Sequence, residues 1–115
     1  MIDRSKKIPA KFYQNYSGKE PVRDWIKSLS AEDRKIVGTD IQKVEFGLPL
    51  QLPYCRNLGH GLWEVRSHLR VNRIGRVIFA LVGGEMVLLH GFIKKTRTTP
   101  KQFIDLARQR MKELV

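Results

Sequence analysis

The most regular alternation of hydrophobic and polar residues runs from Leu62 to Leu69 and predicts a β-strand with one buried face. One face of this strand is apolar or small, whereas the opposite face carries three ionisable side chains in succession. The first face holds Trp63, Val65, Ser67 and Leu69, and the second holds Glu64, Arg66 and His68. The pattern therefore predicts a strand that buries one side in a core and offers the other side for chemistry.

Two more strands are predicted on either side of Gly83-Gly84. The runs from Ile74 to Val82 and from Glu85 to Lys94 are rich in β-branched and aromatic residues. The two glycines between them permit the positive φ angles of a two-residue hairpin turn. We therefore expect an antiparallel pair in which Val82 lies opposite Glu85.

The length of this turn decides which basic residues share a face. A two-residue turn, which we favour, pairs Arg76 with Gly91 and places Arg76 and Lys95 on one face, with the small glycine leaving room beside the guanidinium. A three-residue turn reverses the parity and places Lys94 on the face of Arg76 instead. The roles of the two lysines thus depend on the register.

Helical periodicity marks three other segments. One helix is predicted to begin at Pro21, a second after the cap residue Ser30, and a third after the cap residue Thr99, with Pro100 as its first residue and Gln102 as the capping partner. Each helix has an apolar stripe that we expect to face the core. The stripes are Val22, Trp25, Ile26 and Leu29 in the first helix, Val37, Ile41, Val44 and Leu48 in the second, and Phe103, Leu106, Ala107, Met111 and Leu114 in the third.

The order of the predicted elements indicates the fold class. A first strand is expected between Ile8 and Tyr16, and a long loop from Gly47 to Gly61, which gives the order β-α-α-β-β-β-α. This order predicts an α+β domain in which helices pack on an antiparallel sheet. At 115 residues the chain is long enough for one domain, spanning residues 1–115, and too short for two.

The charge of the chain is strongly positive and unevenly spread. Lys and Arg number 22 against 11 Asp and Glu, which gives a formal net charge of +11 at pH 7. Such a field favours phosphate-rich partners or an acidic protein. The single cysteine, Cys55, can form no intramolecular disulfide, and no stretch has the pattern of an export signal or a membrane span. We therefore expect a soluble, cytoplasmic protein.

The candidate chemistry lies in a cluster of basic residues on and beside the predicted sheet. The sequence contains no Gly-rich phosphate loop, metal-ligand spacing or Ser/His/Asp arrangement, so no metal or cofactor is expected. Arg66 and Arg76 interrupt strands that are otherwise fit for burial, where an unpaired guanidinium is costly. We infer a functional cluster rather than a solvated basic face. It consists of Arg66, Arg70, Arg73, Arg76, Lys94, Lys95, Arg97 and Lys101.

Three strings in this region resemble the phage-derived HigB-like branch of the RelE/ParE toxin superfamily. They are Trp63-Glu64-Val65-Arg66, Arg76-Val77-Ile78-Phe79, and the run HGFIKKTRTTP, which begins at His90 and is the most specific part. The resemblance extends from about Leu58 to Leu114, with the two upstream helices in the expected order. It implies a RelE-like fold, in which an antiparallel sheet packs against two N-terminal helices and carries a C-terminal helix.

The resemblance also implies a function. It points to the toxin of a type II toxin–antitoxin system, a ribosome-dependent endoribonuclease that cleaves mRNA without a metal and is neutralised by an antitoxin, in this branch commonly a helix-turn-helix protein of the HigA kind. Arg66 and Arg76 match strand positions where the superfamily keeps phosphate-contacting bases, and Lys95 matches the basic residue at the end of the last strand. The other bases of the cluster are expected to bind RNA or the ribosome: Arg70, Arg73, Lys94, Arg97 and Lys101.

Proton transfer has several candidates. Glu64 is placed either to accept the 2′-hydroxyl proton or, as we favour, to hold Arg66 by a salt bridge. Many superfamily members use an aromatic residue or a histidine near the last helix, where this chain has Phe103, which cannot transfer protons. His68, on the face of Arg66, is the better titratable candidate, because His90 falls on the opposite face in the favoured register and is expected to be a core residue.

Two other classes of function stay open at the level of the sequence. One is a ParE-like poison of DNA gyrase, or a basic module that binds nucleic acid without cutting it. The other is a non-catalytic regulator whose charge serves to bind an acidic antitoxin segment. Basic residues that converge on one face favour cleavage, because a gyrase poison does not need them to converge.

Overall fold

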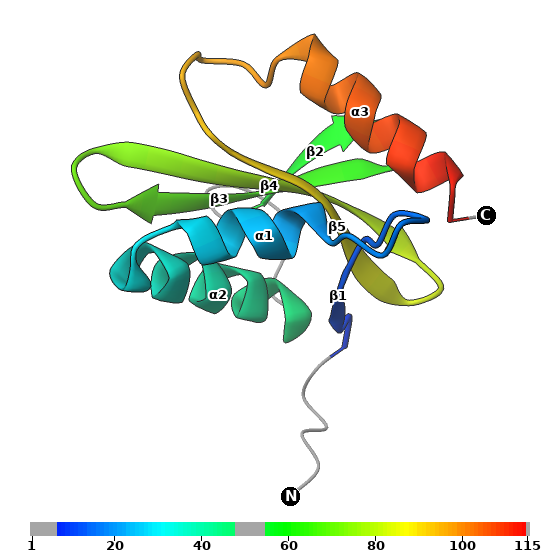
Figure 1. Cartoon of the computed structure of the whole chain (residues 1–115), viewed down its shortest axis with the longest axis horizontal. Coiled ribbons are helices and arrows are strands. Elements are labelled where there is room, and N and C mark those ends of the chain that lie inside the picture. The colour runs from blue at the N-terminus through cyan, green and yellow to red at the C-terminus, as the bar shows by residue number, and fades with distance from the viewer. Residues whose placement is uncertain (1–6, 48–54, 115) are drawn as a thin grey trace, which may run out of the picture.

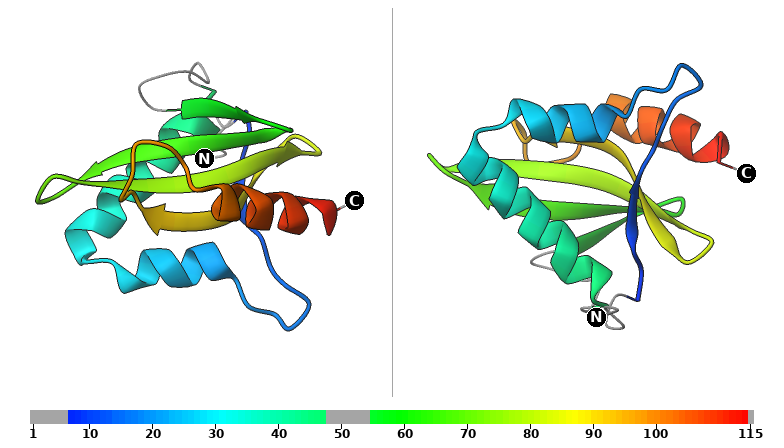
Figure 2. Two further views of the ribbon diagram at one scale, coloured as in Figure 1. Left: turned by 90° about the horizontal axis from the view of Figure 1, so that it is seen from above. Right: turned by 60° about the horizontal axis from the view of Figure 1, so that its bottom comes forward.

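The computed structural model describes residues 7–47 and 55–114 and confirms the predicted α+β class. A sheet forms the middle layer, with α1 and α2 packed on one face and α3 on the other (Figure 1). The views of Figure 2 show the same layers from above and from below. The elements are β1 (Ala10–Phe12), α1 (Pro21–Ser28), α2 (Ala31–Glu45), β2 (Cys55–Gly59), β3 (Leu62–Leu69), β4 (Arg73–Val82), β5 (Glu85–Ile93) and α3 (Lys101–Lys112).

The sheet has five strands in the order β1-β5-β4-β3-β2 and is mostly antiparallel. Two features differ from the prediction. The short strand β1 pairs in parallel with β5, between Met86 and Leu88, so the sheet is not antiparallel throughout. Part of the expected loop is strand β2, which pairs with β3 and begins at the buried residue Cys55. Burial raises the pKa of the Cys55 thiol to about 11, which keeps it uncharged at neutral pH.

The predicted start of two helices is confirmed. Helix α1 begins at Pro21, and the hydroxyl of Ser30 accepts a hydrogen bond of 3.2 Å from the backbone N–H of Asp33, which caps α2. Helix α3 is different, because Pro100 is its N-terminal cap and no side chain caps it. The expected capping role of Thr99 is therefore wrong, and its hydroxyl makes other contacts described below.

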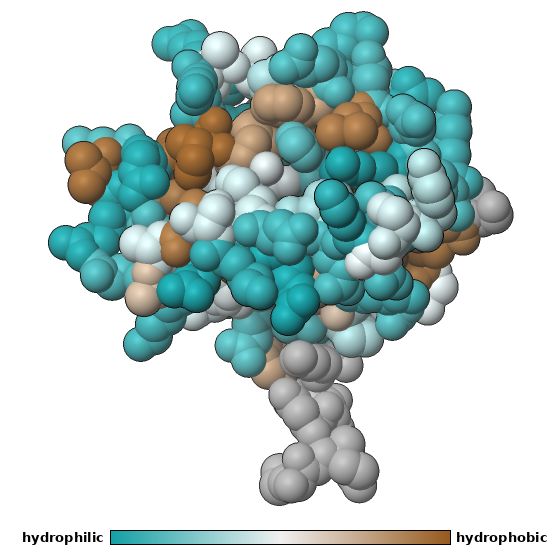
Figure 3. All heavy atoms as spheres, viewed as in Figure 1, coloured by the Kyte–Doolittle hydropathy of each residue, from teal (hydrophilic) through white to brown (hydrophobic). Residues whose placement is uncertain are grey.

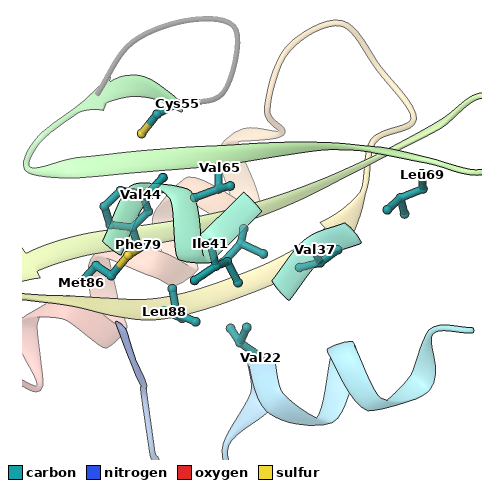
Figure 4. Packing of buried hydrophobic residues seen from close by; sticks show 11 residues of the cluster. Val22, Val37, Ile41, Val44, Cys55, Val65, Leu69, Phe79, Met86 and Leu88 are labelled. Carbon is teal, nitrogen blue, oxygen red and sulfur yellow. The ribbon is translucent and has the colours of Figure 1, made fainter. Parts of the chain in front are cut away.

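Each face of the sheet carries its own hydrophobic core. The face of the molecule shown in Figure 3 is largely hydrophilic, and the large apolar side chains of the strands are mostly buried. Figure 4 shows the core beneath α1 and α2, which includes Val22, Val37, Ile41, Val44, Val65, Phe79 and Leu88. The second core, beneath α3, includes Leu62, Ile78, Ala80, Val87, Leu89 and Ala107. The helical stripes thus face the core as predicted, except that Ile104 rather than Leu106 packs against the core beneath α3 and that Leu48 lies outside the described residues.

The β4–β5 hairpin has the predicted two-residue turn. Val82 lies opposite Glu85, and the intervening glycines Gly83 and Gly84 have φ angles of 57° and 81°. Only a short way along the pair, however, a β-bulge interrupts the register, because β5 contributes the extra residue Leu89. This bulge changes which side chains meet further along.

The bulge overturns the expected pairing of the basic residues. Arg76 lies opposite Phe92 rather than Gly91. Because side chains alternate along a strand, Lys94, two residues beyond Phe92, falls on the face of Arg76, and the expected placement of Lys95 there is wrong. The two-residue turn was predicted correctly. The bulge, and not a longer turn, exchanged the faces on which Lys94 and Lys95 lie.

A buried carboxylate ties α2 to the β3–β4 turn. Asp33 accepts hydrogen bonds from the backbone of Arg70 at 3.2 Å and from Nη2 of Arg73 at 2.5 Å. Burial acts to raise the pKa of Asp33, but these hydrogen bonds outweigh it and hold the pKa below its usual value. A carboxyl whose pKa is lowered by folding stabilises the fold above its unfolded pKa, and this contribution is lost as the pH falls through the folded pKa.

Asp33→Asn is expected to lower the Tm at pH 7 and to flatten its dependence on pH. The wild-type protein should lose stability as the pH falls through roughly 4 and below, whereas the variant lacks this group and should lose less. Thermal unfolding followed by circular dichroism between pH 7 and pH 3 measures both effects. Asp24→Asn, at an exposed position of α1, is the matched control and should leave the wild-type slope. Equal slopes for wild type and Asp33→Asn would contradict the assignment.

Candidate functional site

The centre of the candidate site is a buried ion pair between β3 and β4. Nη1 of Arg76 lies 3.3 Å from Oε1 of Glu64, and the two side chains are 1% and 0% exposed. They are diagonal neighbours, since Arg76 lies directly opposite Arg66, two positions beyond Glu64. The expectation that Glu64 holds Arg66 is wrong, because the carboxylate pairs with Arg76 instead.

The hydroxyl of Thr99 forms hydrogen bonds with both members of this pair. It donates a hydrogen bond of 2.6 Å to Oε2 of Glu64 and accepts one of 3.0 Å from Nη1 of Arg76. Nη2 of Arg76 also donates to the backbone carbonyl of Arg97, at 3.4 Å. The segment between β5 and α3 therefore arches over β3 and β4, as Figures 1 and 2 show, and is fastened to the ion pair beneath it.

Positive charge around the single carboxylate exceeds what it can neutralise. Burial, followed by repulsion from Arg76 and Arg66, lowers the pKa of Lys94 below its usual value. Burial likewise lowers the pKa of Arg76; Glu64 opposes this shift and Arg66 adds to it. Arg66, Arg76 and Lys94 thus share one face with one buried acid, and Arg56, which lies opposite Glu64 on β2, adds to their positive charge.

Two of these cations have unsatisfied hydrogen-bond donors. The Nε atoms of Arg66 and Arg76 are buried and have no hydrogen-bond partner among the described residues. Buried donors without an acceptor are uncommon in folded proteins and call for an explanation. Surplus positive charge and unused N–H groups on one face are suited to binding an anion such as a phosphodiester.

The other basic residues lie at the edges of this site. Arg70 and Lys101 have carboxylate partners, Arg70 with Glu32 and Lys101 with Asp105 at 2.9 Å, and Arg73 is bound to Asp33. His68 is exposed on the strand face of Arg66, while Lys95 and Arg97 are exposed beyond the end of β5. The structure therefore brings together Glu64, Arg66, Arg76 and Lys94, with Lys95 at their margin.

His90 does not lie where the favoured register placed it. The bulge puts it opposite Ile78, on the face of Arg76, where its ring lies 4.6 Å from that of Phe103 and 5.6 Å from that of Phe92. Burial, with a smaller effect from Arg110, lowers the pKa of His90 to about 4. The imidazole is therefore neutral at pH 7, and its Nε2 atom is buried without a hydrogen-bond partner in the described structure.

Sequence reasoning missed two residues of the site, Arg56, which lies opposite Glu64 on β2, and Thr99. The position of Thr99 before Pro100 is typical of a helix cap, and that pattern accounted for the residue. The charges of Glu64 and Arg76 could have indicated a further polar partner, because a buried ion pair needs additional hydrogen bonds to satisfy its remaining atoms. Among the described residues no group of three or more His, Cys, Asp or Glu side chains gathers as a candidate metal site.

The sheet and its flanking helices define a small α+β domain, and a family match places it in the HigB/RelE-like superfamily. Within it, residues 24–112 match the family model described as "Phage derived protein Gp49-like (DUF891)", and the chain belongs to this family. No curated protein matches the chain. The family implies a cognate antitoxin as partner and is consistent with a toxin–antitoxin toxin.

Among the described residues, no helix combines the length and apolar character that a membrane span requires.

Proposed function

We propose that this protein is the toxin of a type II toxin–antitoxin system and that it cleaves mRNA on the ribosome. The observation that supports the proposal is the meeting of Arg66, Arg76 and Lys94 on one face beside a single acid, with two guanidinium Nε donors unused in the described structure. A polyanion with a charge that increases during reaction is the substrate that such a face suits. The match to the Gp49-like family agrees with this reading.

The proposed reaction is an attack by the ribose 2′-oxygen on the adjacent phosphorus. The 2′-hydroxyl proton is lost to a base, the new O–P bond forms, and the bond from phosphorus to the 5′-oxygen breaks as that oxygen takes up a proton. The products are a 2′,3′-cyclic phosphate and a free 5′-hydroxyl. No metal is needed, provided that the protein supplies positive charge to the pentacoordinate intermediate.

Residues of the site divide among these tasks. Arg66, Arg76 and Lys94 are proposed to stabilise the negative charge that develops on the phosphate oxygens. Glu64 positions Arg76, because both its oxygens already face Arg76 or Thr99. His68, exposed on the strand face of Arg66, is the proposed group for proton transfer.

The segment that carries Thr99 bears on access to the site. Since Thr99 lies over the ion pair and Arg76 is 1% exposed, substrate contact with Arg76 requires this segment to move away. The partner that controls the toxin is proposed to be an antitoxin of the helix-turn-helix kind, to which a chain of net charge +11 would be attracted through acidic segments.

Mapping of RNA 5′ ends after a short pulse of expression tests the proposed function. Cuts at fixed codon positions in translated mRNA, which disappear when translation initiation is blocked, are the expected result. Signs of DNA damage without cuts would indicate a gyrase poison and overturn the proposal. Absence of both cuts and growth arrest would indicate a non-catalytic regulator, and would overturn it as well.

Lys94→Ala is expected to reduce cleavage more than Lys95→Ala does. The reason is the bulge in β5, which places Lys94 rather than Lys95 beside Arg66 and Arg76. The two variants remove the same charge from adjacent positions and are therefore matched to each other. Initial rates of cleavage of ribosome-bound mRNA measure the difference. A larger loss for Lys95→Ala would show that the strand register does not decide which lysine meets the phosphate.

A further inference from the structure

A second concave site lies along the free edge of β5. Strand β1 pairs with β5 only between Met86 and Leu88, so in the described structure no strand covers that edge beyond this point. A pocket of about 570 Å³ occupies the place, within the size range typical of small-molecule sites. Its walls include Trp25, His90, Gly91, Phe92, Lys95 and Phe103. In Figure 3 hydrophobic residues gather on the part of the surface between α1 and α3.

The walls of this pocket are aromatic on both sides of the strand edge. On one side the rings of Phe92 and Phe103 lie 4.6 Å apart at 47°, and His90 completes their cluster. On the other side Trp25 of α1 lies against the backbone of β5, so closely that a Cβ atom at Gly91 would come within 2.4 Å of its ring. The space at Gly91 therefore admits Trp25, and not the Arg76 guanidinium that the sequence had suggested.

The polar groups of the pocket fit a neutral heterocycle better than an ion. His90, which lines the pocket, is uncharged at pH 7, and its buried Nε2 atom has no partner among the described residues. Gln102, at the mouth, carries both a donor and an acceptor. Flat apolar walls with a few such groups are the means by which proteins hold unstacked bases.

Positive charge links this pocket to the phosphate site. Lys95 and Thr96 line both the aromatic pocket and a neighbouring cleft, which also contains Lys94 and Arg97. A ligand that placed a planar group between the aromatic walls would thus have its phosphates beside cations. This combination of stacking surface and adjacent positive charge is typical of single-stranded nucleic-acid binding.

We propose that the pocket between Trp25 and Phe103 binds one unstacked nucleobase of single-stranded RNA. The inference rests on the proposed function for the identity of the polymer, although the pocket itself requires only a base with a phosphate attached. It assigns a binding role to Trp25 and Phe103, which the sequence had placed in the core. Neither residue takes part in the chemistry of cleavage.

Fluorescence of Trp25 tests the proposal directly. The chain has two tryptophans, so a full-length Trp63→Phe variant retains Trp25 as the single reporter. Adenosine 5′-monophosphate and cytidine 5′-monophosphate are expected to quench its emission saturably, whereas ribose 5-phosphate, which lacks the base, should not. Equal quenching by ribose 5-phosphate, or no quenching by either nucleotide, would overturn the proposal.

A matched pair of variants separates stacking from general effects. In the Trp63→Phe background, Phe103→Leu keeps an apolar side chain but removes the flat ring, and should weaken nucleotide binding by roughly 5- to 150-fold. Tyr16→Leu removes an aromatic ring at a position that is 102% exposed and should leave binding unchanged. Equal affinities for the Phe103→Leu and parent proteins, both folded by circular dichroism, would overturn the assignment.

Base binding and RNA cleavage can be tested separately. Arg66→Ala in the reporter background is expected to lower the cleavage rate by about 10²–10³-fold while base-dependent quenching persists. Quenching without any RNA cuts in cells would uphold the base pocket and reject the nuclease. RNA cuts without base-dependent quenching would uphold the nuclease and reject the base pocket.

Discussion

Arg66→Ala is expected to lower the rate of RNA cleavage by about 10²–10³-fold while leaving the protein folded. The size of this loss follows from the contribution of one preorganised hydrogen-bond donor to the stabilisation of a developing anion, which is roughly 2.7–4 kcal/mol. The variant is expected to stay folded because Arg66 is only partly buried and lies opposite another guanidinium, that of Arg76. Removing it relieves repulsion, so the Tm should stay constant or rise slightly.

The measurement combines two readouts on the same preparation. Initial cleavage rates of ribosome-bound mRNA report the loss of function, and thermal unfolding reports the fold. Arg34→Ala, at an exposed position of α2, removes the same charge from a different surface and serves as control. An equal loss of activity in Arg34→Ala would mean that net charge alone, rather than the site, determines the rate. A large fall in Tm for Arg66→Ala would mean that Arg66 is structural.

The sequence predicted the parts of the site that depend on local rules. Alternation along β3 placed Glu64 and Arg66 on the face away from the α1–α2 core, and the structure confirms this. The glycine pair at 83 and 84 fixed the turn. These features follow from the two-residue period of a strand and from the φ angles that glycine permits, both of which can be read from neighbouring residues.

The bulge at Leu89 could not be predicted in this way. Each of Leu88, Leu89 and His90 fits a regular strand, and the nearby Gly91 is not the extra residue, because it pairs regularly with Val77. Its position depends on contacts distant in the chain: Arg110 of α3 donates a hydrogen bond of 2.6 Å to the carbonyl of Leu89, and Trp25 of α1 occupies the space at Gly91. One unrecognised residue was enough to exchange the predicted roles of the two lysines.

The partners of Glu64 could not be predicted either, because they too depend on contacts between residues distant in the chain. Cross-strand diagonals are decided by register, and the hydroxyl of Thr99 reaches the pair only because the segment before α3 folds back over the sheet. The segment has a strong local interpretation as a helix start, and tertiary contacts overrode it. Strand β2 was missed because two of its residues, Arg56 and Asn57, are polar and exposed, as in a loop.

Removing one member of the Glu64–Arg76 pair is expected to cost about 3–5 kcal/mol in the free energy of unfolding. Either Glu64→Ala or Arg76→Ala leaves a charge almost fully buried and without its partner. Urea unfolding monitored by circular dichroism measures the cost. Because both single variants are expected to be poorly folded, their loss of toxicity would by itself say little about catalysis.

The double variant Glu64→Leu/Arg76→Met separates the structural role of the pair from its functional role. It replaces both charges by apolar groups of similar size, a change that is often neutral or stabilising, so it should recover most of the stability lost in the single variants. Thr99 then loses both partners, but it is only partly buried and can turn to water. If Arg76 stabilises the phosphate during reaction, this well-folded protein should still be inactive. A double variant that cleaves RNA at the wild-type rate would show that Arg76 only holds the sheet and the segment above it together, and the phosphate site would then consist of Arg66 and Lys94.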